Sequence, residues 1–377
     1  MAQLRLGMVG GGQGAFIGAI HRIAARLDGQ FTLVAGALSS EAQRAKASGA
    51  ELGLDPARCY SDFRDMAKSE AARDDGIDVV AIVTPNHLHA PAAIAFLQAG
   101  IHVICDKPLS ATLEDAVALE AAVKASGKQF ILTHNYTGYP LIRQARDMVA
   151  NGTLGALRLV QVEYAQDWLT EAPAADNKQA AWRTDPKQAG AGALGDIGTH
   201  AFNLASFVSQ LDVQELSAEV SSFVPGRLVD DNAHVSLRYE GGARGTLWCS
   251  QVAPGNENAL RLRIYGDKGG LEWAQENPNQ LWYTPLGAPK QLLTRAGAGA
   301  SDVANRVSRT PGGHPEGYLE GFATIYTEAA QAIRAADEGT PLSAGHHTNG
   351  IAEGMAGMRF IAACLASSQA NAAWTAL

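Results

Sequence analysis

The chain has 377 residues, of which 46% are hydrophobic and 18% charged, and its formal net charge is −8. This composition is typical of a globular protein with room for two domains, and it excludes a disordered or fibrous chain. The negative charge and the lack of any Lys/Arg run argue against nucleic-acid binding. No apolar run approaches membrane-spanning length, so a membrane partner is not expected.

The four cysteines lie far apart and form no C-x-x-C pair, which is typical of reduced thiols. An apolar strand is predicted to begin at Leu4, which leaves no room for a signal peptide. We therefore expect a cytoplasmic protein.

From Leu4 to about Thr133 the hydrophobic pattern alternates between strands and helices. Strands are predicted at residues 4–9, 31–38, 78–84, 102–105 and 129–133, and helices at 16–27, 41–52, 63–69, 89–99 and 113–126. This alternation with short connections predicts right-handed βαβ units and a parallel sheet covered on both faces. We predict an α/β protein whose N-terminal Rossmann domain, residues 1–133, binds a dinucleotide across the carboxyl ends of its strands.

After His134 the pattern changes to that of an α+β domain for substrate binding and oligomerisation, residues 134–377. Helices are predicted at 141–150, 201–209, 315–337 and 349–367, and strands at 159–166, 215–224, 233–240, 243–252, 260–265, 270–274 and 281–284. Gly241-Gly242 and Asp267-Lys268-Gly269 predict turns between strands, and residues 285–313, rich in Gly, Ala, Pro and Ser, predict a loop or arm. We expect a large, open, mainly antiparallel sheet whose bare face forms a homo-dimer or homo-tetramer. The last helices can pack back on the first domain.

The stretch LRLGMVGGGQGAFIG at residues 4–18 carries the first strand into a glycine-rich turn. Glycines let the backbone approach a pyrophosphate, and free N–H groups at the helix start attract its charge. The usual G-x-G-x-x-G spacing is altered, because the third glycine is delayed to Gly18. A tight turn without ligand gives a similar pattern, but a position directly after a strand favours dinucleotide binding. The candidate cofactor contacts here are Gly10, Gly12, Gln13, Ala15, Phe16 and Ile17.

The second predicted strand ends in Leu38-Ser39-Ser40, followed by Arg44. An NAD-preferring fold normally has Asp or Glu at this place to bind the ribose hydroxyls. The two serine hydroxyls and an arginine suit a 2′-phosphate better, although Arg44 is equally consistent with a solvated helix residue. We expect NAD or NADP as cofactor, with NADP accepted.

Two further strand ends lie at the same edge of the predicted sheet. Thr84, Pro85 and Asn86 form a strand-to-helix turn, and His89 follows at the helix start; the two histidines of H-x-H point apart on a helix, which argues against a metal site. Asp106-Lys107-Pro108 follows the next strand. A lysine beside a nicotinamide can steer a substrate hydroxyl or carry a proton, whereas the alternative is a surface lysine paired with Asp106.

Gly195-Asp196-Ile197-Gly198-Thr199-His200 precedes a helical pattern. Asp196 and His200 are four residues apart and can share one side of the first turn. A carboxylate beside an imidazole raises its basicity, which suits a base that takes a proton from an alcohol. A helix-capping Asp with a buried structural His is an equally good interpretation.

These residues together resemble the Gfo/Idh/MocA oxidoreductase family, which contains glucose–fructose oxidoreductase and inositol 2-dehydrogenase. The resemblance rests on the glycine turn and on TPNHLH (84–89), HVICDKP (102–108), AWR (181–183) and GDIGTH (195–200). The family's usual Glu-Lys-Pro is Asp106-Lys107-Pro108 here. The resemblance implies that Lys107, Asp196 and His200 form the catalytic set. It also implies that Trp182 and Arg183 lie near the nicotinamide or the substrate.

The remaining candidate residues fall into two groups, cofactor contacts and substrate contacts. The cofactor candidates outside the glycine turn are Ser39, Ser40, Arg44, Thr84, Pro85, Asn86, His89, Asp106, Lys107, Pro108, Asn135, Trp182 and Arg183. The substrate candidates are Lys107, Tyr136, Trp168, Arg183, Asp196, His200 and His314, with Arg306, Arg309 and Glu316 as further charged groups near the arm.

The expected reaction is hydride transfer between nicotinamide and a secondary hydroxyl or ketone of a sugar, sugar derivative or cyclitol, without a metal. His200 would accept the hydroxyl proton, Asp196 would orient His200 or bind a neighbouring hydroxyl, and Lys107 would bind the reacting oxygen. One alternative is an NAD-dependent glycosidase that oxidises a sugar transiently, eliminates the aglycone and reduces the ring again. A non-catalytic, dinucleotide-sensing regulator is the third.

Overall fold

The computed structural model describes residues 2–172 and 177–377. The chain divides into two compact units. The first unit is Met1–His134 with Phe322–Met355, and the second is Asn135–Gly321 with Ala356–Leu377.

The first unit contains the predicted parallel sheet, with five strands in the order β2-β1-β3-β4-β5. Its elements are β1 (Leu4–Gly10), α1 (Phe16–Leu27), β2 (Phe31–Ala37), α2 (Ala42–Glu51), α3 (Phe63–Ala71), β3 (Val79–Val83), α4 (His89–Gln98), β4 (His102–Cys105), α5 (Leu113–Ser126) and β5 (Phe130–Leu132). All four strand pairs are parallel. The strand order reverses between β1 and β3, and a crevice outside the carboxyl ends of such strands is where a dinucleotide binds.

Apolar runs explain this sheet. Every residue of Val79–Val83 is buried, as expected for a central parallel strand covered on both faces. The later helix α11 (Tyr318–Glu338) adds to the same core, because the ring of Tyr326 packs edge-on against Phe31 at 5.5 Å.

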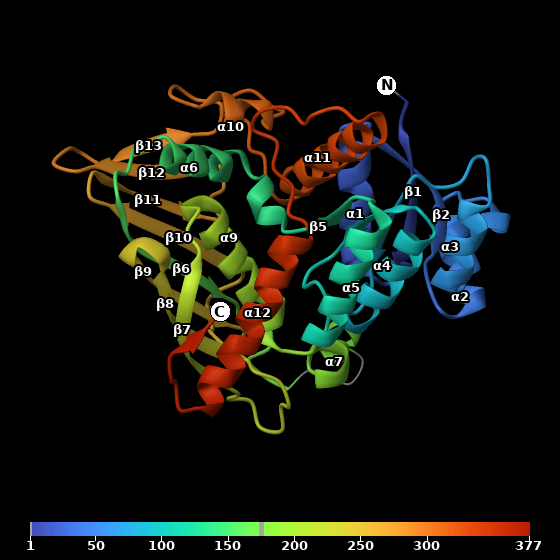
Figure 1. The fold of residues 1–377 in the computed structure, drawn as a ribbon, viewed down its shortest axis with the longest axis horizontal. Helices are drawn as coiled ribbons and strands as arrows, with labels where there is room; N and C mark the ends of the chain where they lie inside the picture. Colours follow the sequence, from blue (N-terminus) through green and yellow to red (C-terminus); the bar gives the residue numbers. More distant parts are fainter. Residues whose placement is uncertain (1, 173–176) are drawn as a thin grey trace. The chain divides into compact units, whose positions relative to one another are not determined.

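The second unit is built on a nine-stranded sheet in the order β13-β12-β11-β10-β6-β9-β8-β7-β14 (Figure 1). The strands are β6 (Leu157–Ala165), β7 (Val213–Ser221), β8 (Asn232–Tyr239), β9 (Arg244–Ser250), β10 (Ala259–Gly266), β11 (Gly269–Ala274), β12 (Gln280–Pro285), β13 (Gln291–Thr294) and β14 (Thr375–Ala376). Among the described strand pairs of this second sheet, only β6 and β9 pair in parallel. The prediction of a mainly antiparallel second sheet is confirmed.

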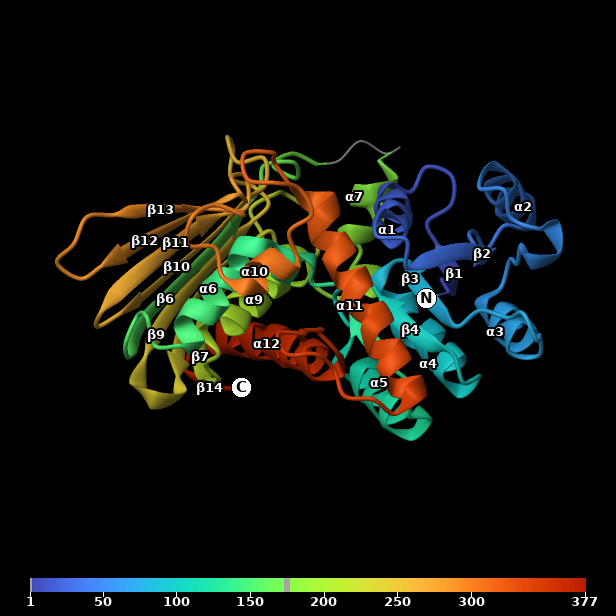
Figure 2. The same ribbon diagram turned by 90° about the horizontal axis from the view of Figure 1, so that it is seen from above.

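Helices cover one face of this sheet, as Figure 2 shows for α6, α9, α10 and α12. The helices of the chain beyond β5 are α6 (Pro140–Ala150), α7 (Lys178–Arg183), α8 (Pro186–Ala189), α9 (Thr199–Ser209), α10 (Asp302–Arg306), α11 and α12 (Ile351–Gln369). Phe202 of α9 stacks on Phe360 of α12 with 4.5 Å between ring centroids. Burial alternates along β8, with Val235 and Leu237 turned inward and His234 and Ser236 exposed. β8 therefore turns polar side chains toward the helix-free face.

Residues 285–313 are more structured than the sequence predicts. The segment contains β13, which pairs with β12, and the short helix α10. A buried ion pair joins Arg295, within the segment, to Glu316, just beyond it, with nitrogen and oxygen 3.0 Å apart. The predicted loop or arm therefore contains a strand and a short helix, because sheet pairing and one long-range ion pair outweigh the turn-forming composition.

Candidate active site

The glycine turn between β1 and α1 needs glycine for two physical reasons. Gly10 and Gly11 have φ of +80° and +72°, which side chains rarely adopt. A Cβ on Gly12 would lie 2.5 Å from the carbonyl oxygen of Leu38, and one on Gly18 would collide with the backbone of Gly11. Gly18 thus serves as the third glycine by allowing close helix packing, although it comes late in the sequence.

The start of α1 is open to an anion. Ala15 occupies the N-cap position in an extended conformation, and no side chain caps the helix. The first N–H groups of the helix, beginning at Phe16 and Ile17, therefore need another acceptor. At the neighbouring end of β3, Oγ1 of Thr84 is buried and has no hydrogen-bond partner among the described residues. The glycine cradle, the uncapped helix and this hydroxyl fit a bound dinucleotide.

At the end of β2, the Oγ of Ser39 accepts a hydrogen bond at 3.1 Å from the backbone N–H of Glu41, the N-cap residue of α2. Arg44 lies 3.4 Å from the Glu41 carboxylate, and both side chains are largely exposed. Ser40 is exposed as well. An exposed pair of this kind is weak, so Arg44 can exchange Glu41 for another anion.

The loop after β4 is held by the Asp106 carboxylate. Its Oδ1 accepts from the backbone N–H of Lys107 and from Oγ1 of Thr133, each at 2.9 Å. The Lys107–Pro108 peptide bond is cis. Lys107 itself is half-buried at the carboxyl edge of the sheet.

Two buried histidines, His89 and His134, lie at this edge of the sheet. Nδ1 of His89 lies 2.7 Å from the carbonyl oxygen of Pro108, and Nε2 lies 2.9 Å from that of Thr84, so the ring joins the ends of β3 and β4. Burial lowers the pKa of His89. His134 has a pKa lowered to about 3, first by burial and then by the charge of Lys107. Asn86, in the turn before His89, is buried too.

In the second unit, GDIGTH forms a π-helical turn, Leu194–Gly198, which leads directly into α9. Asp230 anchors this turn by accepting hydrogen bonds from the backbone N–H groups of Gly192 and Leu194, each at 2.7 Å. Burial raises the pKa of Asp230. π-Helical turns are rare and are frequent at functional sites.

Asp196 lies in this turn and contacts one residue that the sequence analysis predicted and one that it missed. Its Oδ2 is 3.4 Å from Nε of Arg183 and accepts a 2.8 Å hydrogen bond from Nε2 of Gln251. The Arg183 guanidinium lies 4.3 Å from the ring centroid of Trp182. The structure thus brings Trp182, Arg183 and Asp196 together.

His200, in the first turn of α9, is buried against two tyrosines. Its ring lies edge-on to Tyr136 at 4.8 Å and tilted to Tyr164 at 6.3 Å. The two tyrosine hydroxyls are 2.5 Å apart, and that of Tyr164 donates to Oδ1 of Asn258 at 2.7 Å. Burial raises the pKa of both tyrosines, and the charge of Asp196 adds to the effect. Both phenols therefore stay protonated.

Four supporting residues escaped the sequence analysis: Tyr164, Asp230, Gln251 and Asn258. Each lies in or next to a strand of the nine-stranded sheet. No motif surrounds them, and only the pairing of β6 with β9 and β10 brings them to one site.

The other predicted residues of the second unit lie in varied surroundings. Trp168 is 40% exposed, and its Nε1 donates to Gln166 at 3.0 Å. Asn135 is buried, and its Nδ2 has no hydrogen-bond partner among the described residues. His314 and Arg306 are exposed, whereas Arg309 is half-buried.

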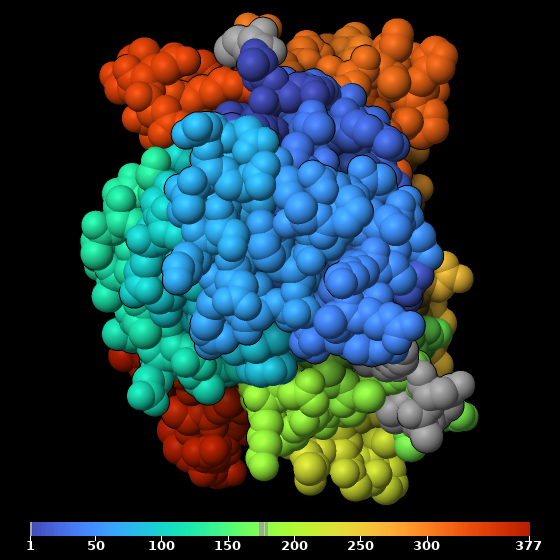
Figure 3. All heavy atoms as spheres, turned by 90° about the vertical axis from the view of Figure 1, so that its right-hand side faces the viewer, coloured from blue at the N-terminus to red at the C-terminus, as the bar shows by residue number. Residues whose placement is uncertain are grey.

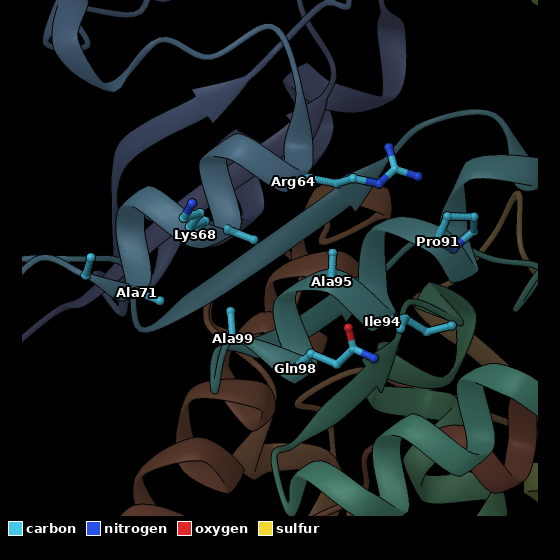
Figure 4. A pocket seen from close by; sticks show the side chains of 10 residues that line it. Arg64, Lys68, Ala71, Pro91, Ile94, Ala95, Gln98 and Ala99 are labelled. Carbon is cyan, nitrogen blue, oxygen red and sulfur yellow. The ribbon is translucent and has the colours of Figure 1, made fainter.

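A surface groove in the first unit is separate from all of these residues. The face in Figure 3 is formed largely by residues of the first unit, coloured blue to teal. Arg64 and Lys68 extend from α3, and Pro91, Ile94 and Gln98 from α4, around a mainly apolar groove (Figure 4). None of the predicted site residues lines it.

Within residues 2–172 and 177–377, no cluster of three or more His, Cys, Asp or Glu side chains could hold a metal. No helix among these residues is long and apolar enough to cross a bilayer. All four cysteines are free thiols.

Family models match both units of the chain. A model described as an oxidoreductase family with an NAD-binding Rossmann fold matches residues 4–134. The GFO/IDH/MocA C-terminal domain model matches residues 142–272.

Relatives match over most or all of the chain. An oxidoreductase structure from Sinorhizobium meliloti is 58% identical, with a TM-score of 0.92 and complete coverage of both chains. An inositol dehydrogenase homolog from Azotobacter vinelandii, complexed with NADH and myo-inositol, is 38% identical, with a TM-score of 0.94 over 100% of this chain and 98% of that one. Levoglucosan dehydrogenase of Pseudarthrobacter phenanthrenivorans is 30% identical over 88% of this chain and 82% of its own. The chain therefore belongs to the Gfo/Idh/MocA family of NAD-binding oxidoreductases.

Proposed function

We propose that this chain oxidises a secondary hydroxyl of a cyclitol or sugar with NAD, or catalyses the reverse reduction. The observation that carries the proposal is the turn at Asp196, whose carboxylate is held by Arg183 and Gln251 just ahead of the buried His200. The relatives complexed with NADH and myo-inositol, or acting on levoglucosan, support the substrate class.

Bound NAD supplies the hydride acceptor. His200 accepts the proton of the substrate hydroxyl, and its aromatic neighbours keep competing water away from the ring. Asp196 orients His200 or binds an adjacent hydroxyl. Lys107 donates a hydrogen bond to the reacting oxygen and stabilises the charge that develops on it.

The substrate candidates differ in whether their polar atoms already have hydrogen-bond partners. The Tyr136 hydroxyl is engaged by Tyr164, so Tyr136 offers its ring and not its hydroxyl. The buried Nδ2 of Asn135 needs an acceptor, which a cofactor amide or a substrate hydroxyl would supply. Trp168, Arg183 and His314 complete the proposed contacts.

The experiment is steady-state kinetics of alcohol oxidation with NAD by the wild type, Lys107→Ala and His200→Ala. Positioned acid–base groups contribute about a hundred- to ten-thousand-fold, so each variant should retain only traces of turnover. Lys128→Ala, a half-buried lysine near Asp337 at the end of the sheet opposite Lys107, is the matched control and should keep wild-type rates. Near-normal kcat in both site variants would contradict the proposal.

A glycosidase that works by transient oxidation remains the second candidate, because it would use the same acid–base groups. Cleavage of a glycoside without net change in nicotinamide absorbance would favour it. A dinucleotide-sensing regulator would leave Lys107, Asp196 and His200 idle, so loss of turnover in their variants argues against it.

The helix-free face of the nine-stranded sheet is the proposed oligomer interface, giving a homo-dimer or homo-tetramer in the cytoplasm. Trp248 and His234 stack on adjacent strands of this face, with ring centroids 6.0 Å apart. Exposed aromatic rings on an open sheet are suited to contact with a second copy.

A further inference from the structure

A fully buried histidine of α1 faces the carboxylate that precedes Lys107. His21 has no exposed surface, and its Nε2 lies 4.0 Å from Oδ1 of Asp106. Its Nδ1 lies 2.8 Å from the hydroxyl of Tyr326 in α11. Nε2 has no hydrogen-bond partner among the described residues. A buried polar nitrogen without a partner is costly, so its presence needs an explanation.

We propose that His21 is a positioning residue: with Tyr326 it fixes the orientation of the Asp106 carboxylate, and through Asp106 it fixes the Lys107 segment for the hydride-transfer reaction. The inference rests on the proposed function, because Lys107 is the group that it serves.

The neighbours of His21 select one tautomer of the neutral ring. With the proton on Nε2, the N–H dipole points toward the Asp106 carboxylate; with the proton on Nδ1, a lone pair would point there instead. In the Nε2–H form Nδ1 is an acceptor, so the Tyr326 hydroxyl donates to it. Burial, together with the charge of Asp106, raises the pKa of Tyr326 and keeps this donor protonated. Burial lowers the pKa of His21, so the ring is neutral.

Asp106 links His21 to the catalytic lysine. The same Oδ1 that faces His21 accepts from the backbone N–H of Lys107 and the hydroxyl of Thr133. Removing His21 therefore takes away one of the groups that orient the Asp106 carboxylate and loosens its hold on the Lys107 backbone.

Other titratable groups surround His21 and Asp106, and the kinetic variants of His21 leave all of them unchanged. Arg22 and His89 act on His21. Cys105, Lys107, His134 and Tyr326 lie within electrostatic range of Asp106 or of its loop.

The first test needs neither cofactor nor turnover. In the full-length chain labelled with ¹⁵N-histidine, the His21 resonances, identified by their loss in His21→Gln, should show a protonated Nε2 and an unprotonated Nδ1. Tyr326→Phe should shift the Nδ1 resonance. A ring protonated at Nδ1 would overturn the proposal.

The second test compares His21→Leu with His21→Gln. Misplacing a catalytic group can cost up to about a hundredfold, so His21→Leu should lower kcat about ten- to hundredfold while the KM for NAD is unchanged. The glutamine amide carries a donor at the position of Nε2, so His21→Gln should restore most of the rate.

His102 provides a matched control. It is 3% exposed, it starts β4 at the end opposite Asp106, and its Nε2 lies 3.2 Å from Asp337. His102→Leu removes the contact of another buried histidine with an aspartate, Asp337, which is itself half exposed, and should leave kcat as in the wild type. Wild-type kinetics in His21→Leu, or an equal loss in His102→Leu, would overturn the inference. A wild type that oxidises no polyol contradicts the proposed function alone, because the tautomer measurement is independent of it.

Discussion

Asp196 depends on donors that come from distant parts of the chain. Nε2 of Gln251 and Nε of Arg183 both approach its Oδ2, at 2.8 and 3.4 Å. A hydrogen bond to a charged group contributes about 1.5–3 kcal/mol, more than a neutral pair. The Gln251 contact is the shorter of the two and fixes the carboxylate on one side. Arg183, held over Trp182, supplies the charge.

We predict that Arg44 influences the choice between NAD and NADP. Because its pairing with Glu41 is exposed and weak, the guanidinium can bind a 2′-phosphate instead. We predict that Arg44→Ala raises the KM for NADP about tenfold, the loss expected from one charge-assisted hydrogen bond, and leaves the KM for NAD unchanged. Initial rates with both cofactors measure this. An unchanged KM for NADP would show that Arg44 is a solvated helix residue.

At the level of single residues, the sequence analysis identified residues inside motifs and missed the residues that hold them in place. Asp196, Trp182 and Arg183 were singled out by motif, and the structure brings them together. Gln251 and Asp230 have no signal of their own, because their partners are set by the register of the nine-stranded sheet.

The π-helical turn Leu194–Gly198 is the element on which the position of Asp196 depends. Asp230 holds it by accepting two backbone N–H groups. Asparagine has one acceptor oxygen and would turn an NH₂ group toward a donor.

We therefore predict that Asp230→Asn lowers the free energy of unfolding by about 1–3 kcal/mol, the cost of one unsatisfied buried donor. It should also lower kcat, since the turn carries Asp196. Urea unfolding and steady-state kinetics measure the two effects. Asp267→Asn is the control, because Asp267 accepts the N–H of Ala156 at an exposed turn. Equal stability of the two variants would contradict this role of Asp230.

The elements of the first unit could be predicted because continuous apolar runs such as Val79–Val83 have few alternatives to a buried parallel strand. β13 and α10 could not. Their segment is rich in glycine and alanine, and β13 exists because it pairs with β12. The sequence around Asp196 predicts an ordinary helix start. In the structure the turn is π-helical, and a hydrogen bond from the backbone to Asp230 holds it.

For the whole molecule, buried neutral histidines couple stability to pH. Burial lowers the pKa of His21, His89 and His134, that of His134 to about 3. The unfolded chain binds these protons near pH 6.5 and the folded chain does not, so unfolding takes up protons in acid. Their contribution to stability is complete above that pH and decreases as the pH falls below it.

We predict that the free energy of unfolding drops between pH 7.5 and 5.5, by about 1 kcal/mol from His134 alone, with His21 and His89 adding to the drop. Urea unfolding at the two pH values measures the drop, and His134→Gln should show a smaller one. Equal or greater stability at pH 5.5 would contradict burial of these rings in the neutral form.

The most direct test of the central claim follows a single hydrogen atom. When a cyclitol or sugar that is deuterated at its secondary carbinol carbons is incubated with the protein and NAD, we predict reduced nicotinamide that carries one deuterium, together with the matching ketone. Mass spectrometry of both products measures this. Reduced nicotinamide without deuterium, or glycoside cleavage with no accumulation of reduced nicotinamide, would contradict the account.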